Sequence, residues 1–296
     1  MTNIPFGGRP LGFVLVALTA TGWGIGWTVF KSLLDIWPPL FARGMCGLVG
    51  AATLAAIAYA TNRSLAVPRA IWLKVIMASL INVAVWMGFT ALSLRWLNVS
   101  EGTLLTYTMP LWVMLLAWPM LGEKPSVRDL VALSLGLSGV ALLVAGPQLS
   151  IPANKFPGVL FALTAAVLFA FGSLKARSPL PIDPLCATAW MVFMGSVSMV
   201  LLSLIFEKPK LGAVGLANVV PFLYIALVPM AACYLSWFGA LQRLAATEAA
   251  MGTLLVPLVG TVTAAIWLNE ELSGKTYASF ALIIGGVALS ILGRNR

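Results

Sequence analysis

Ten hydrophobic runs, each long enough to cross a lipid bilayer as a helix, occupy most of this 296-residue chain. A hydrocarbon core of about 30 Å requires about 20 apolar residues per helix. The runs lie at residues 11–30, 38–60, 71–94, 100–121, 127–146, 157–174, 184–206, 217–241, 248–268 and 276–292. The breaks between them are too short for a water-soluble domain. We therefore predict an all-α integral membrane protein with ten transmembrane helices.

The composition agrees with a lipid environment. Hydrophobic residues make up 60% of the chain and charged residues 9%, whereas soluble domains are about 45–50% apolar. The net charge of +9 comes from basic residues that stand singly between the runs. They are read as topology signals and not as a nucleic-acid surface. The partners expected are the lipid bilayer and a small-molecule substrate, and the protein is expected to act as a monomer.

The basic residues are unevenly divided between the two sides of the membrane. Sorted by alternate loops, eleven fall on the side of the N-terminus and seven on the other. Because lysine and arginine favour the cytoplasmic face, both termini are predicted to be cytoplasmic. The first run lacks a clear small-residue cleavage site, so it is read as a retained helix and not as a signal peptide.

The residues that usually carry catalysis are scarce. The chain has no histidine, and Cys46, Cys186 and Cys233 lie in apolar runs without metal-ligand spacing. No phosphate-binding glycine loop is present. No cofactor, metal site or catalytic residue is expected. All nine acidic residues fall in loops or near run ends. The expected mechanism is thus alternating access driven by the solute gradient, with proton coupling through Glu101 or Glu248 as the alternative.

An internal repeat organises the chain. A gapless offset of 147 aligns residues 97–143 with residues 244–290. Identical residues in this register include leucines, glycines, two glutamate pairs and a proline pair. The repeated unit is predicted to hold five helices, in segments 1–150 and 151–296. Because five is odd, the second copy enters the membrane from the opposite face, as in many secondary transporters.

The repeated motif carries a family resemblance. Glu101, Pro110 and the sequence LGEK at 121–124 recur as Glu248, Pro257 and LNEE at 268–271. This pattern resembles the paired EamA domains of the drug/metabolite transporter superfamily. The string around Trp23 is similar to YddG-type exporters of aromatic amino acids. The resemblance implies an inner-membrane transporter with a central cavity formed largely by the first, third, fourth, sixth, eighth and ninth helices.

Aromatic and polar residues deep inside the runs are the candidates for solute contact. Trp23 and Trp27 share one face of the first helix, as Asn82 and Trp86 do on the third, because residues four apart are neighbours on a helix. An amide at that depth needs a partner, which is either a neighbouring helix or a hydrated cavity. The further candidates by the same reasoning are Tyr107, Phe169, Ser173, Tyr234, Ser236 and Trp237.

Two prolines and one arginine complete the analysis. Pro110 and Pro257 are predicted to kink their helices and to shape or gate the site, since each frees a backbone carbonyl. Gly22 and Gly26 predict close helix packing. Arg43, near the start of the second helix, is expected to snorkel to the interface as an anchor.

The predicted cavity suits a small neutral or zwitterionic solute with apolar character. Aromatic amino acids fit this description, because rings and one amide line the site. A broader metabolite or drug exporter is the alternative, and a membrane-embedded enzyme is a distant one. A cation is less favoured, because no buried acid would pair with it.

Overall fold

The computed structural model describes residues 8–97, 99–144, 153–209, 215–268 and 274–292, and every regular element within these ranges is a helix. The prediction of an all-helical membrane protein is confirmed. In chain order the elements are α1 (Gly8–Leu33), α2 (Pro39–Ala60), η1 (Arg69–Ile71), α3 (Trp72–Ser79), η2 (Leu80–Phe89), α4 (Thr90–Ser93), α5 (Val99–Thr106), α6 (Met109–Leu121), α7 (Val127–Val144), η3 (Ala153–Lys155), α8 (Phe156–Ala176), α9 (Pro184–Phe206), α10 (Leu216–Leu227), η4 (Val228–Ala232), α11 (Cys233–Leu241), α12 (Ala246–Gly252), α13 (Leu255–Leu268) and α14 (Gly274–Leu292).

Nine helical stretches among the described residues are long and apolar enough to cross a membrane. They coincide with nine of the ten predicted hydrophobic runs. The remaining run forms α7, which has 18 residues and carries Asp129 in its first turn. Length and composition alone therefore account for nine spans.

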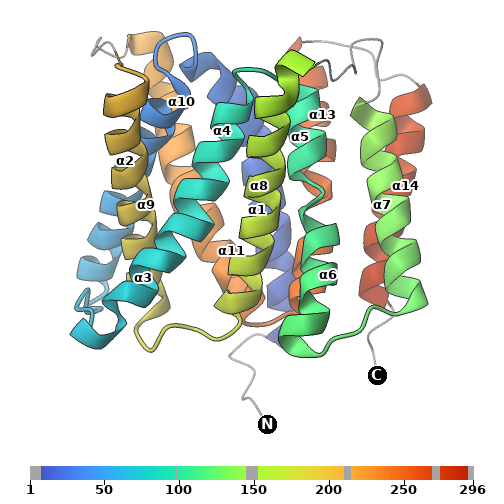
Figure 1. The fold of residues 1–296 in the computed structure, drawn as a ribbon, viewed down its shortest axis with the longest axis horizontal. Coiled ribbons are helices and arrows are strands. Elements are labelled where there is room, and N and C mark those ends of the chain that lie inside the picture. The colour runs from blue at the N-terminus through green and yellow to red at the C-terminus, as the bar shows by residue number, and fades with distance from the viewer. Residues whose placement is uncertain (1–7, 98, 145–152, 210–214, 269–273, 293–296) are drawn as a thin grey trace.

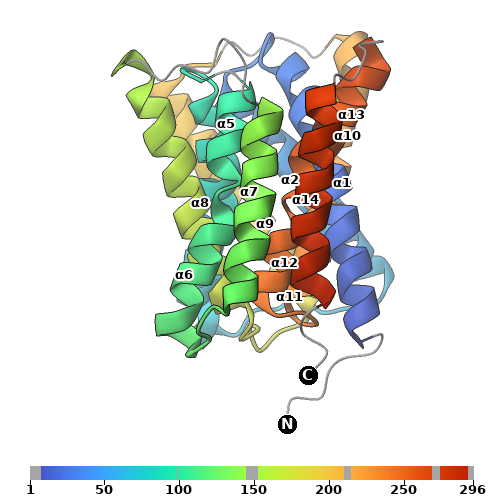
Figure 2. The same ribbon diagram turned by 90° about the vertical axis from the view of Figure 1, so that its right-hand side faces the viewer.

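The helices run side by side in a bundle, and α1 begins at the same end of it at which α14 ends (Figure 1). At one edge α7 packs along α14, and elsewhere α2 packs along α9 (Figure 2). A large apolar core fills the bundle around α1, and a smaller one joins buried side chains of α6, α7, α12 and α14.

Glycines allow α7 and α14 to approach closely. A β-carbon on Gly139 would lie 2.8 Å from the carbonyl oxygen of Ser279, and one on Gly286 would lie 2.6 Å from that of Ala132. Any larger side chain at either position would push the two backbones apart. Small residues are the usual means by which membrane helices pack, since lipid offers no hydrophobic force between them.

Two helical stretches are interrupted in the turn before a proline. Tyr107 and Thr108 separate α5 from α6, and Thr253 and Leu254 separate α12 from α13. Because proline has no N–H, Pro110 and Pro257 cannot continue the α-helical hydrogen-bond ladder to the fourth residue before them. The offset of 147 relates the two prolines, and the interruptions before them agree in that register to within one residue.

Two other stretches contain π-helical segments, in which the turns are wider than in an α-helix. These are η2, within the stretch 69–93, and η4, within the stretch 216–241. Pro229 explains the second, since it also lacks the N–H of a regular ladder. Such segments often lie at functional sites.

A buried glutamate forms an ion pair near each end of the bundle. Glu248 of α12 accepts from Arg9 of α1 at 2.7 Å, and Glu101 of α5 accepts from Lys155, just before α8, also at 2.7 Å. The carboxylates are buried, with side chains 4% and 1% exposed. Figure 1 shows α1 and α8 beginning at opposite ends. Each pair thus joins a glutamate to the start of a distant helix.

Candidate functional site

Seven aromatic side chains from five helical stretches form one cluster inside the bundle. Trp23 of α1 is central, with ring centroids 5.8–6.0 Å from those of Trp86, Phe169, Tyr234 and Trp237. Trp27 of α1 and Tyr107, at the break between α5 and α6, extend the cluster, their centroids 6.4 Å apart. All seven are sequence-predicted site residues, and the structure brings them together.

Three of these rings stack in series across the cluster. Phe169 of α8 lies against Trp86 of η2, with centroids 4.1 Å apart and an interplanar angle of 17°. Its other neighbour is Trp237 of α11, at 5.6 Å and 24°. Stacked aromatic pairs contribute about 0.5–1.5 kcal/mol beyond the area that they bury. The stack therefore holds α8 between η2 and α11.

Two of the rings donate hydrogen bonds to backbone carbonyls in the π-helical segments. The indole Nε1 of Trp23 donates to the carbonyl of Pro229 in η4, at 3.3 Å. The hydroxyl of Tyr234 donates to the carbonyl of Asn82 in η2, at 2.7 Å. The wide turns thus present backbone acceptors to the ring cluster. These bonds fix the orientation of both rings.

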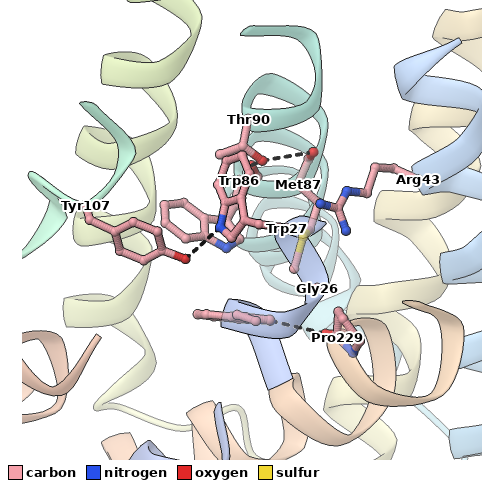
Figure 3. Close-up of a pocket in the computed structure, with 9 residues that line it drawn as sticks. Gly26, Trp27, Arg43, Trp86, Met87, Thr90, Tyr107 and Pro229 are labelled. Atoms are coloured by element: carbon pink, nitrogen blue, oxygen red, sulfur yellow. Dashed lines mark hydrogen bonds between the residues drawn. The ribbon is translucent and has the colours of Figure 1, made fainter. Parts of the chain in front are cut away.

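A small cavity adjoins the rings, as Figure 3 shows. Its volume is ≈ 20 Å³, and on this measure about 10–15 Å³ holds one water molecule. An amino acid does not fit into a space of this size unless the rings move apart. The cavity is lined by Trp23, Gly26, Trp27, Arg43, Trp86, Met87, Thr90, Tyr107 and Pro229.

Arg43 is buried inside the bundle, and the expectation that it snorkels is wrong. Its residue is 5% exposed, and its guanidinium lies 3.6 Å from the ring centroid of Phe30. Figure 3 shows the side chain extending from α2 toward the other cavity residues. The early position of Arg43 in α2 suggested an end of the membrane, but α2 turns this side chain inward. The site therefore contains a fixed positive charge.

Several buried polar atoms near the rings have no hydrogen-bond partner among the described protein groups. They include Asn82 Oδ1, Trp237 Nε1, Thr106 Oγ1 and Arg43 Nε. An unsatisfied buried donor or acceptor costs about 1–3 kcal/mol, and more when it is charged. Each such group calls for an explanation, and a bound water molecule or a bound solute would satisfy it.

Phe169, Tyr234 and Trp237 belong to the ring cluster but not to the cavity lining, and the remaining predicted residues do not line the cavity either. Asn82 is buried against Gly172 of α8, and its Nδ2 donates to the carbonyl of Ala78 at 3.0 Å. Ser173 is buried and donates to the carbonyl of Phe169 at 2.7 Å, whereas Ser236 is half-buried. The buried Pro110 and Pro257 do not line the cavity either. Their binding or gating roles remain predictions.

Sequence reasoning missed four cavity residues besides Gly26. Thr90 lies four residues after Trp86, so extending the predicted helix face by one turn finds it. Met87, Pro229 and Arg43 carry no such signal, because their inward orientation depends on how the helices are rotated in the bundle.

A family model described as the EamA-like transporter family matches the chain twice, over residues 10–145 and 156–292. The uncharacterized transporter YoaV of Bacillus subtilis is 25% identical over 281 residues, covering 95% of each chain. A probable amino-acid metabolite efflux pump of Salmonella typhimurium is 24% identical, covering 94% of each. A crystal structure matches with a TM-score of 0.83 at 20% identity, covering 96% of this chain and 97% of the other. That likeness shows a common fold.

Proposed function

Because the chain belongs to the EamA-like transporter family, and is therefore a multi-pass membrane transporter, we propose that it exports small amphiphilic metabolites by alternating access. Aromatic and other hydrophobic amino acids are the proposed substrates. The site is the ring cluster and its cavity, and the proposed location is the inner membrane, with both termini in the cytoplasm. No cofactor takes part, and one copy of the chain suffices.

The observation that carries this proposal is the cluster of seven rings, four of which line one small cavity. The rings come from both matched segments of the chain, since Trp86 belongs to the first and Phe169 to the second. A soluble protein buries such rings to build a core. In a transporter, faces of aromatic rings offer sites for apolar side chains of a solute, and the unpaired polar atoms beside them offer sites for its polar groups.

A duplicated and inverted five-helix unit is part of the proposal, with segments 1–150 and 151–296 as its copies. The family model matches twice, and the interruptions before Pro110 and Pro257 occur at related positions. The start of α1 and the end of α14 lie at the same end of the bundle, which agrees with an even number of crossings (Figure 1). Composition identifies nine spans among the described residues, and we propose α7 as the tenth.

Alternating access is supported by two buried ion pairs near the ends of the molecule. The ion pairs Arg9–Glu248 and Lys155–Glu101 lie at opposite ends, with the cavity between them. We propose that opening to one side breaks one pair while the other remains. The sequence contains no histidine, and no carboxylate of the described ranges lines the cavity. The solute gradient is thus the proposed driving force.

Amino acids are favoured as substrates because two relatives bear that description. The probable amino-acid metabolite efflux pumps of Salmonella typhimurium and Escherichia coli cover 94% and 95% of this chain. Their identity to it is 24% and 23%. A broader range of metabolites or drugs is the alternative. The counterflow experiment described next decides between the two substrate ranges.

Counterflow in proteoliposomes tests the proposal. Purified protein is reconstituted with unlabelled solute inside, and uptake of labelled phenylalanine is measured against a panel of aromatic, aliphatic and charged amino acids and a lipophilic cation. We expect phenylalanine and tryptophan to exchange and the cation not to. Exchange of the cation without any amino acid would overturn the proposed substrate class, and exchange of none would overturn transport of these solutes.

Cysteine labelling tests the inverted arrangement separately. Lys124 and Lys275, both exposed, are replaced singly by cysteine in a protein without its native cysteines. An impermeant thiol reagent applied from one side of the membrane should label one variant and not the other. Labelling of both from the same side would contradict the inverted repeat, whatever the outcome of the transport assay.

A further inference from the structure

We infer that the cavity recognises an anionic group of the solute, a carboxylate in the case of amino acids, through Arg43 with Tyr107 as a second donor. The inference rests on the proposed function and narrows its substrate class. It predicts that the carboxylate of an aromatic amino acid is required for binding, while the amino group is dispensable.

The first step is the charge of Arg43, which the described protein groups leave uncompensated. Arginine remains protonated in proteins, and a buried charge is costly unless it is paired. The four ion pairs among the described residues do not include Arg43. No described side chain hydrogen-bonds to its guanidinium, whose observed partner is the ring of Phe30.

The nearby carboxylate of Glu207 already accepts hydrogen bonds from other groups. Glu207, at the end of α9, accepts from the backbone N–H groups of Leu40 and Phe41 in the first turn of α2, at 3.1–3.3 Å. It also accepts from the hydroxyl of Ser203 at 2.6 Å. This carboxylate therefore stabilises the start of the helix that carries Arg43, instead of pairing with Arg43 itself.

The second step is the hydroxyl of Tyr107. It accepts a hydrogen bond from Nε1 of Trp27 at 3.1 Å, and among the described residues it donates to none. Trp27 thereby occupies one lone pair of the oxygen and leaves the hydroxyl hydrogen available. Arg43 and Tyr107 line the same cavity. A carboxylate between them would receive a charge-assisted bond from each.

The third step is that the cavity offers few hydrogen-bond acceptors. Its indole and guanidinium groups are donors only, and the Pro229 carbonyl already accepts from Trp23. The hydroxyl of Thr90 donates to the carbonyl of Trp86 at 2.7 Å, so its oxygen remains as a neutral acceptor. Among the described residues, no carboxylate lines the cavity. An ammonium group would find a cation there and no counter-charge, whereas an anion finds two donors.

Binding of two phenylalanine fragments to the full-length protein tests the inference. The probes are 3-phenylpropionate, which lacks the amino group, and phenethylamine, which lacks the carboxylate. We expect 3-phenylpropionate to raise the melting temperature of the purified protein and to bind at least about tenfold more tightly than phenethylamine, a ratio that corresponds to about 1.4 kcal/mol. Equal binding of the two probes, or a preference for the amine, would overturn the inference.

Variants of Arg43 assign the effect to the residue. Arg43→Gln should abolish the response to 3-phenylpropionate, and Arg43→Lys should retain part of it. The matched control is Arg95→Gln, at an exposed arginine. It should respond as the wild type does. Removing an unpaired buried charge stabilises a fold, so Arg43→Gln without ligand should melt no lower than the wild type. Undiminished binding of 3-phenylpropionate by Arg43→Gln would overturn the inference. If that variant does not fold, the inference is tested by the preference of the wild type for 3-phenylpropionate over phenethylamine and by the binding of 3-phenylpropionate to Arg43→Lys.

The counterflow assay distinguishes this inference from the proposed function. Phenylalanine exchange that phenethylamine inhibits as strongly as 3-phenylpropionate would leave the transport function standing and reject anion recognition. Selective binding of 3-phenylpropionate without any exchange of amino acids would keep anion recognition and reject the proposed substrates.

Discussion

Trp86 of η2 lies flat on Phe169 of α8, with ring centroids 4.1 Å apart. The two rings come from the two segments that the family model matches. Their contact therefore joins the segments directly at the edge of the cavity. A solute that entered between these segments would replace this ring contact with contacts of its own.

Trp86→Ala should abolish or strongly reduce phenylalanine exchange in proteoliposomes. The substitution removes a ring that lines the cavity and stacks on Phe169, and loss of a buried tryptophan costs about 3–5 kcal/mol of stability. Trp86→Phe keeps a ring and should retain part of the activity. The control is Trp118→Ala, at a tryptophan that is 54% exposed. Full exchange by a folded Trp86→Ala protein would contradict the site.

Tyr107→Phe should weaken binding of 3-phenylpropionate by about tenfold. The ring remains, but the hydroxyl donor is lost, and a hydrogen bond to a charged group contributes about 1.5–3 kcal/mol. Tyr224→Phe is the matched control, because its hydroxyl donates to the carbonyl of Gly22 outside the cavity lining. Isothermal titration of both variants checks the prediction, and equal losses would show that the effect is not local.

Gly286→Ala should lower the melting temperature, whereas Gly285→Ala should not. A β-carbon on Gly286 meets the backbone of α7 at 2.6 Å, while one on Gly285 meets nothing within 4 Å. Overpacking of this kind costs about 1–3 kcal/mol. Thermal unfolding in the same detergent compares the neighbouring positions. Similar melting temperatures for the two variants would mean that the α7–α14 contact is looser than described.

Neutralising Glu101 or Glu248 should open the end of the bundle at which that glutamate lies. Glu101→Gln removes the ion pair with Lys155, and Glu248→Gln removes the one with Arg9. Met87→Cys, in a protein without native cysteines, reports access to the cavity. Glu101→Gln should speed its reaction with an impermeant reagent from the Lys155 side, and Glu248→Gln from the Arg9 side. The reverse pattern, or no change, would separate these ion pairs from gating.

The sequence was sufficient for the helices and for most of the ring cluster. Hydrophobic runs measured against bilayer thickness located the spans within a few residues, because the bilayer leaves little choice of backbone structure. Tryptophans and tyrosines far from the ends of runs identified the ring cluster, since tryptophan and tyrosine otherwise favour the interfaces.

The rest depended on tertiary structure. Arg43 lies five residues into α2, a position that fits either an interfacial anchor or an inward charge, and only the rotation of α2 in the bundle decides. The π-helical segment η2 contains no proline, so the sequence has no signal that predicts it. The closure of the rings around a cavity of ≈ 20 Å³ reflects how the helices pack, and periodicity within one helix does not report it.

The glycine contact between α7 and α14 also sets an order of assembly. Every other described helix precedes α14 in the chain, so α7 must be inserted into the membrane well before its partner has been synthesised. Until then, the small residues on α7 face lipid or a neighbour that α14 later displaces. A chain halted before residue 274 would leave the Gly139 face of α7 without the partner that it has in the folded protein. The packing of α7 is therefore completed only after α14 has been inserted.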